Sequence, residues 1–160
     1  MHKSHGSEGA HGNMNYRHLA IMVVLSFISM YVFMYAMVDT FANVFMSFNQ
    51  VYMAGLMTAP MVIIELIVMG AMYANKRLNM IIIAGSVVAL LAFFLLIRQQ
   101  TLIDDAQFLR SMIPHHAGAI LMCQKASIQD PEIKELCRGI LSGQRSEIDL
   151  MKAKLDALGK

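Results

Sequence analysis

Three long apolar runs, separated by short polar segments, dominate the first 97 residues of the chain. The first run covers residues 19–38 without a charged side chain, and the other two cover approximately residues 52–74 and 80–97. A helix of about 20 residues crosses the roughly 30 Å hydrocarbon core of a bilayer. The pattern therefore predicts a transmembrane region at 19–97 with three spanning helices, preceded by a polar, His-rich tail at 1–18.

The pattern changes after residue 97 to helical spacing with polar positions between the apolar ones. One predicted helix has a face that repeats at steps of four and three residues, formed by Phe108, Met112, His115, Ala119, Met122 and Ala126. Asp130 followed by Pro131 is a typical helix start. The second helix has a predicted face formed by Ile133, Cys137, Ile140, Gln144, Glu147, Met151 and Leu155.

A short connection between these two helices predicts an antiparallel helical hairpin over residues 98–160. The fold class is therefore all-α, with three transmembrane helices followed by the hairpin. Two helices alone bury little core. We expect the hairpin to pack on a second copy, so that a homodimer completes a four-helix bundle, or else on the membrane region.

Charge follows the same division of the chain. Residues 19–97 contain four charged side chains, whereas residues 98–160 contain seventeen. The formal net charge is only +2, and no basic patch indicates binding to nucleic acid. The expected surroundings are a lipid bilayer for the spans and water for the hairpin.

Positively charged residues predict the orientation in the membrane. Lys3 and Arg17 precede the first span and Lys76 and Arg77 follow the second, whereas the loop at 39–51 has no Lys or Arg. Loops rich in Lys and Arg stay in the cytoplasm. We therefore expect a multi-pass protein of a bacterial inner membrane, with a cytoplasmic N-terminus and a periplasmic C-terminal domain.

The two cysteines are symmetric about the predicted turn. Folding the hairpin about residue 130 places residues whose numbers sum to about 260 opposite one another, so Cys123 faces Cys137. Facing Cα atoms would lie roughly 4–5 Å apart, which is within disulfide range. An oxidising compartment favours a disulfide, while two reduced thiols or shared metal ligation remain open alternatives.

The same register gathers soft and polar side chains near the middle of the hairpin. His116 lies level with Gln144, and Met112, His115, Glu147 and Met151 lie within about two helical turns of that level. Imidazole with thioether suits copper, particularly cuprous copper, and a carboxylate would extend the site toward harder divalent ions. The alternative is structural packing, because Pro114 leaves a helical carbonyl without its usual donor and a polar neighbour could satisfy it.

The stretch from Phe108 to Ile120, with its Pro114-His115-His116 sequence, and the later Gln144-x-x-Glu147-Ile148-x-x-Met151 resemble the bacterial family called domain of unknown function 305. The resemblance covers about residues 104–156. It implies a small, ferritin-like helical domain, commonly exported, with copper binding or copper tolerance in some members. It further implies that the motif positions are Met112, His115, His116, Glu147 and Met151, with Met122 as a further ligand.

Many members of that family carry the unit twice, whereas this chain carries it once. The resemblance therefore favours pairing of two chains. The three spans are similar to those of a membrane-anchored branch of the family.

The transmembrane region has candidate residues of its own. Glu65 lies well inside the second span, where an ionisable side chain is costly and is either functional or paired with a polar neighbour. Methionines recur on the same span at helical spacing, either as packing or as a relay for a soft cation; they are Met53, Met57, Met61, Met69 and Met72. The tail adds His2, His5, His11, Met14 and His18, which could bind metal loosely or simply be solvated.

These observations lead to three hypotheses of function. The first is a membrane-anchored periplasmic protein that binds copper ion for buffering, tolerance or delivery to a copper-handling protein. The second is an accessory or assembly subunit that binds no metal, and the third is a small metal conduit that uses Glu65 and the methionines. No enzyme is expected, since the sequence has no nucleophile elbow, phosphate loop or zincin motif, and its only Glu-x-x-His lies at Glu8 to His11 in the tail.

Overall fold

The computed structural model describes residues 5–159, with side chains from Met14 onward. The described residues form α-helices, short 3-10 turns and loops without a strand, which confirms the all-α prediction. The α-helices are α1 (His5–Phe33), α2 (Phe48–Val68), α3 (Lys76–Gln99), α4 (Asp105–Lys125) and α5 (Pro131–Ala157), and the 3-10 turns are η1 (Met34–Met37) and η2 (Phe41–Asn43).

Among the described residues, three helical segments are long and apolar enough to cross a membrane: Met14–Met37, Phe48–Val68 and Lys76–Gln99. The prediction of a membrane protein is thereby confirmed, although the bounds of the spans differ from those expected. The helix α1 starts at His5 and continues through much of the expected tail. His2 and the side chains of His5 and His11 lie outside the described residues.

The chain divides into two compact units. The membrane unit contains residues 1–31 and 51–99, and the hairpin unit contains residues 32–50 and 100–160. The expected hairpin domain at 98–160 is therefore extended by the segment that connects α1 to α2.

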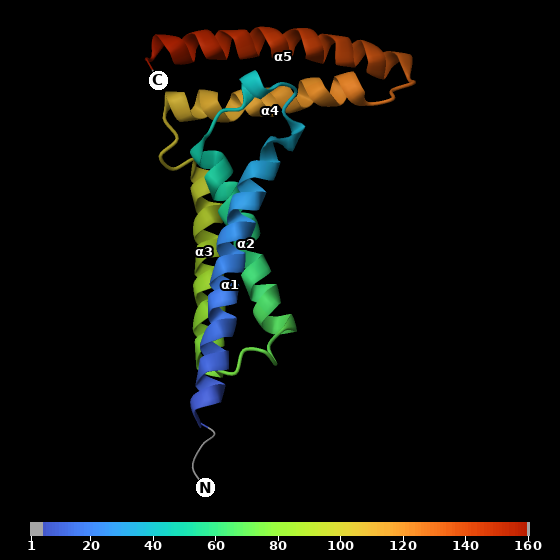
Figure 1. Cartoon of the computed structure of the whole chain (residues 1–160). Coiled ribbons are helices and arrows are strands. Elements are labelled where there is room, and N and C mark those ends of the chain that lie inside the picture. Colours follow the sequence, from blue (N-terminus) through green and yellow to red (C-terminus); the bar gives the residue numbers. More distant parts are fainter. Residues whose placement is uncertain (1–4, 160) are drawn as a thin grey trace. The chain divides into compact units, whose positions relative to one another are not determined.

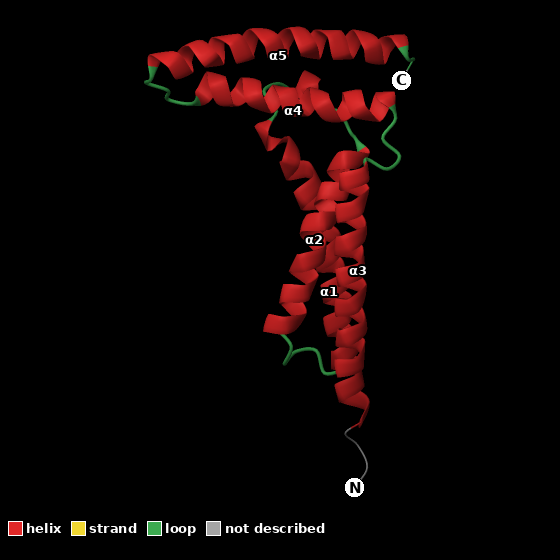
Figure 2. Ribbon diagram, turned by 180° about the vertical axis from the view of Figure 1, so that it is seen from behind, coloured by secondary structure: helices red, strands yellow, loops and turns green. Residues whose placement is uncertain are grey.

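The membrane unit consists of α1, α2 and α3, which lie side by side (Figures 1 and 2). The buried face of α2 includes the small residues Ala54, Gly55 and Ala59. Small residues let helices approach closely in a membrane. At Gly55 the approach is so close that an added Cβ would lie 2.4 Å from the ring of Phe93.

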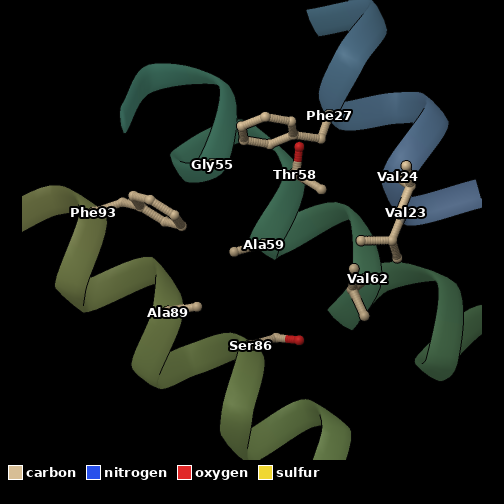
Figure 3. Close-up of a pocket in the computed structure, with 10 residues that line it drawn as sticks. All are labelled: Val23, Val24, Phe27, Gly55, Thr58, Ala59, Val62, Ser86, Ala89 and Phe93. Carbon is tan, nitrogen blue, oxygen red and sulfur yellow. The ribbon is translucent and has the colours of Figure 1, made fainter. Parts of the chain in front are cut away.

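All three helices of the membrane unit surround an apolar cavity of about 330 Å³ (Figure 3). Its walls come from α1, α2 and α3, and the hydroxyl of Thr58 inside it donates a hydrogen bond to the Ala54 carbonyl at 2.7 Å. The cavity is lined by Val23, Val24, Phe27, Gly55, Thr58, Ala59, Val62, Ser86, Ala89 and Phe93. The three helices are therefore incompletely packed at this level.

The hairpin unit is built on α4 and α5, which run antiparallel to each other (Figures 1 and 2). Both helices begin at an aspartate cap. The Asp104 carboxylate accepts a hydrogen bond from the Gln107 N–H at 2.8 Å, and Asp130 accepts from the Glu132 and Ile133 N–H groups. Each cap satisfies N–H groups that have no partner within the helix, so the chain turns at the position the sequence predicts.

Side chains from α4, from α5 and from the 32–50 segment form the core of the hairpin unit. Buried side chains from α4 and α5 form its centre: Ala106, Ile113, Ala117, Ile120, Ile148, Met151 and Leu155. Val38 and Phe45 from the 32–50 segment pack against them. This segment continues beside α4, since an added Cβ at Gly118 would lie 3.6 Å from the Met37 carbonyl oxygen. The 32–50 segment thus covers part of the surface for which a second chain was expected.

The predicted contact face of α4 is partly wrong. Phe108 and Met122 are half exposed and His115 is exposed, while the small residues Ala106 and Ala117 are buried. The reason is that α4 is covered by both α5 and the 32–50 segment, so close approach at small residues decides which positions are buried. On α5, Ile133 is likewise half exposed, and Ile148 rather than Glu147 enters the core.

Candidate metal centre

His116 on α4 and Glu147 on α5 meet across the hairpin. The Nε2 atom of His116 lies 2.8 Å from Oε2 of Glu147, and its Nδ1 atom lies 2.9 Å from the backbone carbonyl oxygen of Met112. A carbonyl oxygen can only accept a hydrogen bond, so Nδ1 carries a proton and donates it. The other ring nitrogen, Nε2, is directed at the carboxylate. It either shares a proton with Glu147 or, without that proton, can bind a metal ion.

This arrangement is typical of a histidine prepared for metal binding. Ligating histidines commonly donate their second ring N–H to a carbonyl or carboxylate, which sets both the tautomer and the ring orientation. The His116 side chain is 12% exposed and that of Glu147 is 56% exposed, so the pair lies at the edge of the core and is open to solvent on the Glu147 side.

The spacing of the pair also fits a shared cation. Nitrogen and oxygen ligands about 2.0–2.2 Å from one ion, at angles of roughly 90–110°, are separated by about 2.9–3.5 Å. The observed separation of 2.8 Å would have to increase by only a few tenths of an ångström. In the form described, the same two atoms are joined directly as an ion pair or a hydrogen bond.

The other predicted ligands fall into two groups. Met151 is buried in the hairpin core and Met112 packs against that core, one turn from Glu147 and His116 respectively. His115 is exposed, with its ring centroid 6.1 Å from that of His116, and Met122 is half exposed. The structure thus brings His116 and Glu147 together, places Met112 and Met151 in or against the hairpin core, and leaves His115 and Met122 on the surface.

Gln144, which the sequence predicted to lie level with His116, has a buried polar atom without a hydrogen-bond partner among the described residues. This atom is its Oε1. Gln144 precedes Glu147 by three residues, so both lie on the same side of α5. Within the described part of the chain no three His, Cys, Asp or Glu side chains cluster as a metal site.

Cys123 on α4 and Cys137 on α5 form a disulfide, with Cα atoms 5.4 Å apart. Of the three alternatives left open by the sequence, the structure has the covalent one, and the two sulfur atoms are not free for a metal ion. The bond joins the two helices near the turn and so aligns them at the level of His116 and Glu147.

Glu65 is paired within the membrane unit. Tyr73, in the connection after α2, donates a hydrogen bond from its hydroxyl to Oε1 of Glu65 at 3.2 Å. Burial, together with the Glu65 carboxylate, raises the pKa of Tyr73, so the phenol remains a donor. A polar partner was one of the two alternatives for Glu65, although this tyrosine comes from a connection and not from another span.

The methionine pattern on α2 lies mostly outside the contacts between helices. Met53, Met57 and Met69 are exposed, whereas the buried face of α2 carries small and branched residues. On α1, the sulfur of Met30 lies 3.5 Å from the Thr58 hydroxyl oxygen, whose single proton is shared with the nearer Ala54 carbonyl. Met53 and Met57 therefore lie outside the contacts between helices, and the relay for a soft cation stays a prediction.

The fold and the candidate site define a membrane protein that carries a disulfide-closed helical hairpin with a His–Glu pair. Residues 98–158 match the family described as Domain of unknown function (DUF305), and the chain belongs to this family. It is 32% identical over 146 residues to "Uncharacterized protein L153" of Acanthamoeba polyphaga mimivirus, a match that covers 89% of this chain and 94% of that protein. The similarity therefore extends from the hairpin into the transmembrane region. No solved structure matches the chain.

Proposed function

We propose that this protein is a membrane-anchored metal-binding protein whose hairpin binds a copper ion without catalytic turnover. His116 and Glu147 would supply the central ligands, with the thioethers of Met112 and Met151 beside them. The observation that carries the proposal is the His116 ring, oriented by the Met112 carbonyl so that Nε2 faces a carboxylate oxygen 2.8 Å away. Thioether and imidazole together favour copper over harder ions.

The proposed role is metal buffering, tolerance or delivery to a copper-handling protein partner. The distribution of Lys and Arg supports an inner-membrane location in a bacterium, with the N-terminus in the cytoplasm and the hairpin in the periplasm. The disulfide between Cys123 and Cys137 supports an oxidising compartment for the hairpin.

A second copy of the chain remains part of the proposal. The surface of α5 includes Leu136 and Leu150, which are 61% and 59% exposed, with Gly139 and Gly143 between them in open space. These positions follow one another at steps of three, four and seven residues, the spacing of a helix-pairing face. A homodimer through this face would complete a four-helix bundle from two hairpins.

The competing proposal is an accessory subunit in which His116 and Glu147 only hold the hairpin together. Their direct contact is the observation that favours it. The test is copper binding by the full chain in detergent micelles, measured against a competing chromogenic chelator for wild type, His116→Ala and His115→Ala. The second variant is a matched control because His115 is exposed and does not contact Glu147.

We expect His116→Ala to weaken copper binding at least tenfold and His115→Ala to weaken it much less. Unchanged copper affinity in His116→Ala, together with a lower melting temperature, would support the accessory subunit instead.

A further inference from the structure

The membrane unit contains a second, smaller cavity whose lining is rich in metal-ligating groups. This cavity of about 190 Å³ lies where α1, the end of α2 and the connection after α2 meet. Its lining includes His18, Met22, Glu65 and Met72, with Asn15 and Tyr73 beside them. An imidazole, a carboxylate and two thioethers from separate segments thus surround one space.

Hydrogen bonds hold these segments together. Asn15 donates from Nδ2 to the Met72 carbonyl at 2.6 Å, and the Tyr16 hydroxyl donates to Oδ1 of Asn79 at 2.6 Å. Leu19, Leu66 and Tyr73 are buried in a cluster at the same place. These contacts tie the start of the described part of α1 to the 69–75 connection and to the first turn of α3.

Of the four candidate ligands, His18 and Met72 are exposed, and Met22 and Glu65 are half-buried. Oε1 of Glu65 accepts one hydrogen bond from Tyr73. The structure ends α2 at Val68, so Glu65 lies in its last turn, near the end of the span and not well inside it as the sequence predicted. A carboxylate there is still stabilised by a positive charge or by hydrogen bonds.

We propose that this cavity binds one monovalent soft cation, Cu⁺, through His18, Glu65, Met22 and Met72. Two thioethers and a neutral imidazole are ligands that cuprous copper prefers. The single negative charge of Glu65 balances the charge of a monovalent ion, so the complex carries no net charge. A divalent ion would leave a net positive charge there. This site is separate from the hairpin and does not depend on the proposed function.

Silver ion serves as the probe, since it is a soft monovalent cation that undergoes no redox cycling under these conditions. Ag⁺ is titrated against a competing chelator into the full chain in detergent micelles, in a His116→Ala background that removes the hairpin ligand. The variants are Glu65→Gln, which keeps the shape and the acceptor for Tyr73, and Met72→Leu. Met69→Leu is the matched control, because Met69 is an exposed methionine nearby that does not line the cavity.

The background chain should bind one Ag⁺, and both Glu65→Gln and Met72→Leu should weaken that binding at least tenfold, with Met69→Leu unchanged. Zn²⁺ at equal concentration should not displace the silver. The proposal is overturned if the background chain binds no Ag⁺, or if Glu65→Gln and Met72→Leu bind it as well as Met69→Leu. The series is repeated with Glu147→Gln as the background, in case His116→Ala does not fold. If the hairpin binds no metal, the expected Ag⁺ binding at the membrane-unit cavity is unchanged.

Discussion

Removal of the Cys123–Cys137 disulfide should loosen the hairpin unit by an amount that follows from the length of the loop it closes. The two cysteines are 14 positions apart. For a loop of about 15 residues, the chain-entropy model gives about 3 kcal/mol, which corresponds to about a 150-fold change in the equilibrium between closed and open hairpin. This is a large share of the stability that a small helical unit can have.

Native-state hydrogen exchange of the full chain in detergent micelles measures this opening directly. In Cys123→Ala/Cys137→Ala, amides of α4 and α5 should exchange up to about 150-fold faster than in the oxidised wild type, while amides of α3 keep their rates. Reduced wild type is the matched control, because it breaks the bond and keeps both side chains. An acceleration of less than threefold in α4 and α5, or an equal one in α3, would refute the reasoning.

Two further predictions concern the hairpin core and the orientation. Ile113→Ala should destabilise the hairpin unit by about 2–5 kcal/mol in thermal unfolding, because Ile113 is fully buried. Gln124→Ala, at an exposed position of α4, should change stability by about 0.5 kcal/mol or less, and equal effects of the two substitutions would contradict the assigned core. The orientation is tested with single cysteines in a Cys123→Ala/Cys137→Ala background, using an impermeant maleimide on intact cells with a permeable outer membrane. Ala42→Cys should be labelled and Ala74→Cys should not. Both positions are exposed and lie in connections at opposite ends of the spans. The reverse pattern of labelling would invert the proposed topology.

The sequence predicted those parts of the fold that depend on local signals. Long uncharged runs identified the spans, and Asp130-Pro131 located the turn of the hairpin. The simple antiparallel register was also sufficient to place Cys123 opposite Cys137 and to bring His116 within reach of Glu147. All of these depend on periodicity and short-range geometry.

The parts that the sequence did not predict depend on contacts between distant segments. The packing of residues 32–50 on α4 changed which face of that helix is buried, and no local pattern shows such a contact. His18, Met72 and Glu65 are separated widely along the chain, and only the close approach of α1 to the 69–75 connection brings them to one cavity. The unsatisfied oxygen of Gln144 likewise becomes visible only when its surroundings are known.

The inclusion of residues 32–50 in the hairpin unit means that the backbone passes between the two units three times, after residues 31, 50 and 99. A domain attached through one flexible linker can be excised, transplanted or exchanged between proteins without loss of its own core. Here a fragment that starts near residue 98 would lack Val38 and Phe45, which pack against the buried cluster of α4 and α5. The natural piece for any transplant or fusion is therefore the whole chain, and a gene that carried only the C-terminal hairpin would encode an incomplete core.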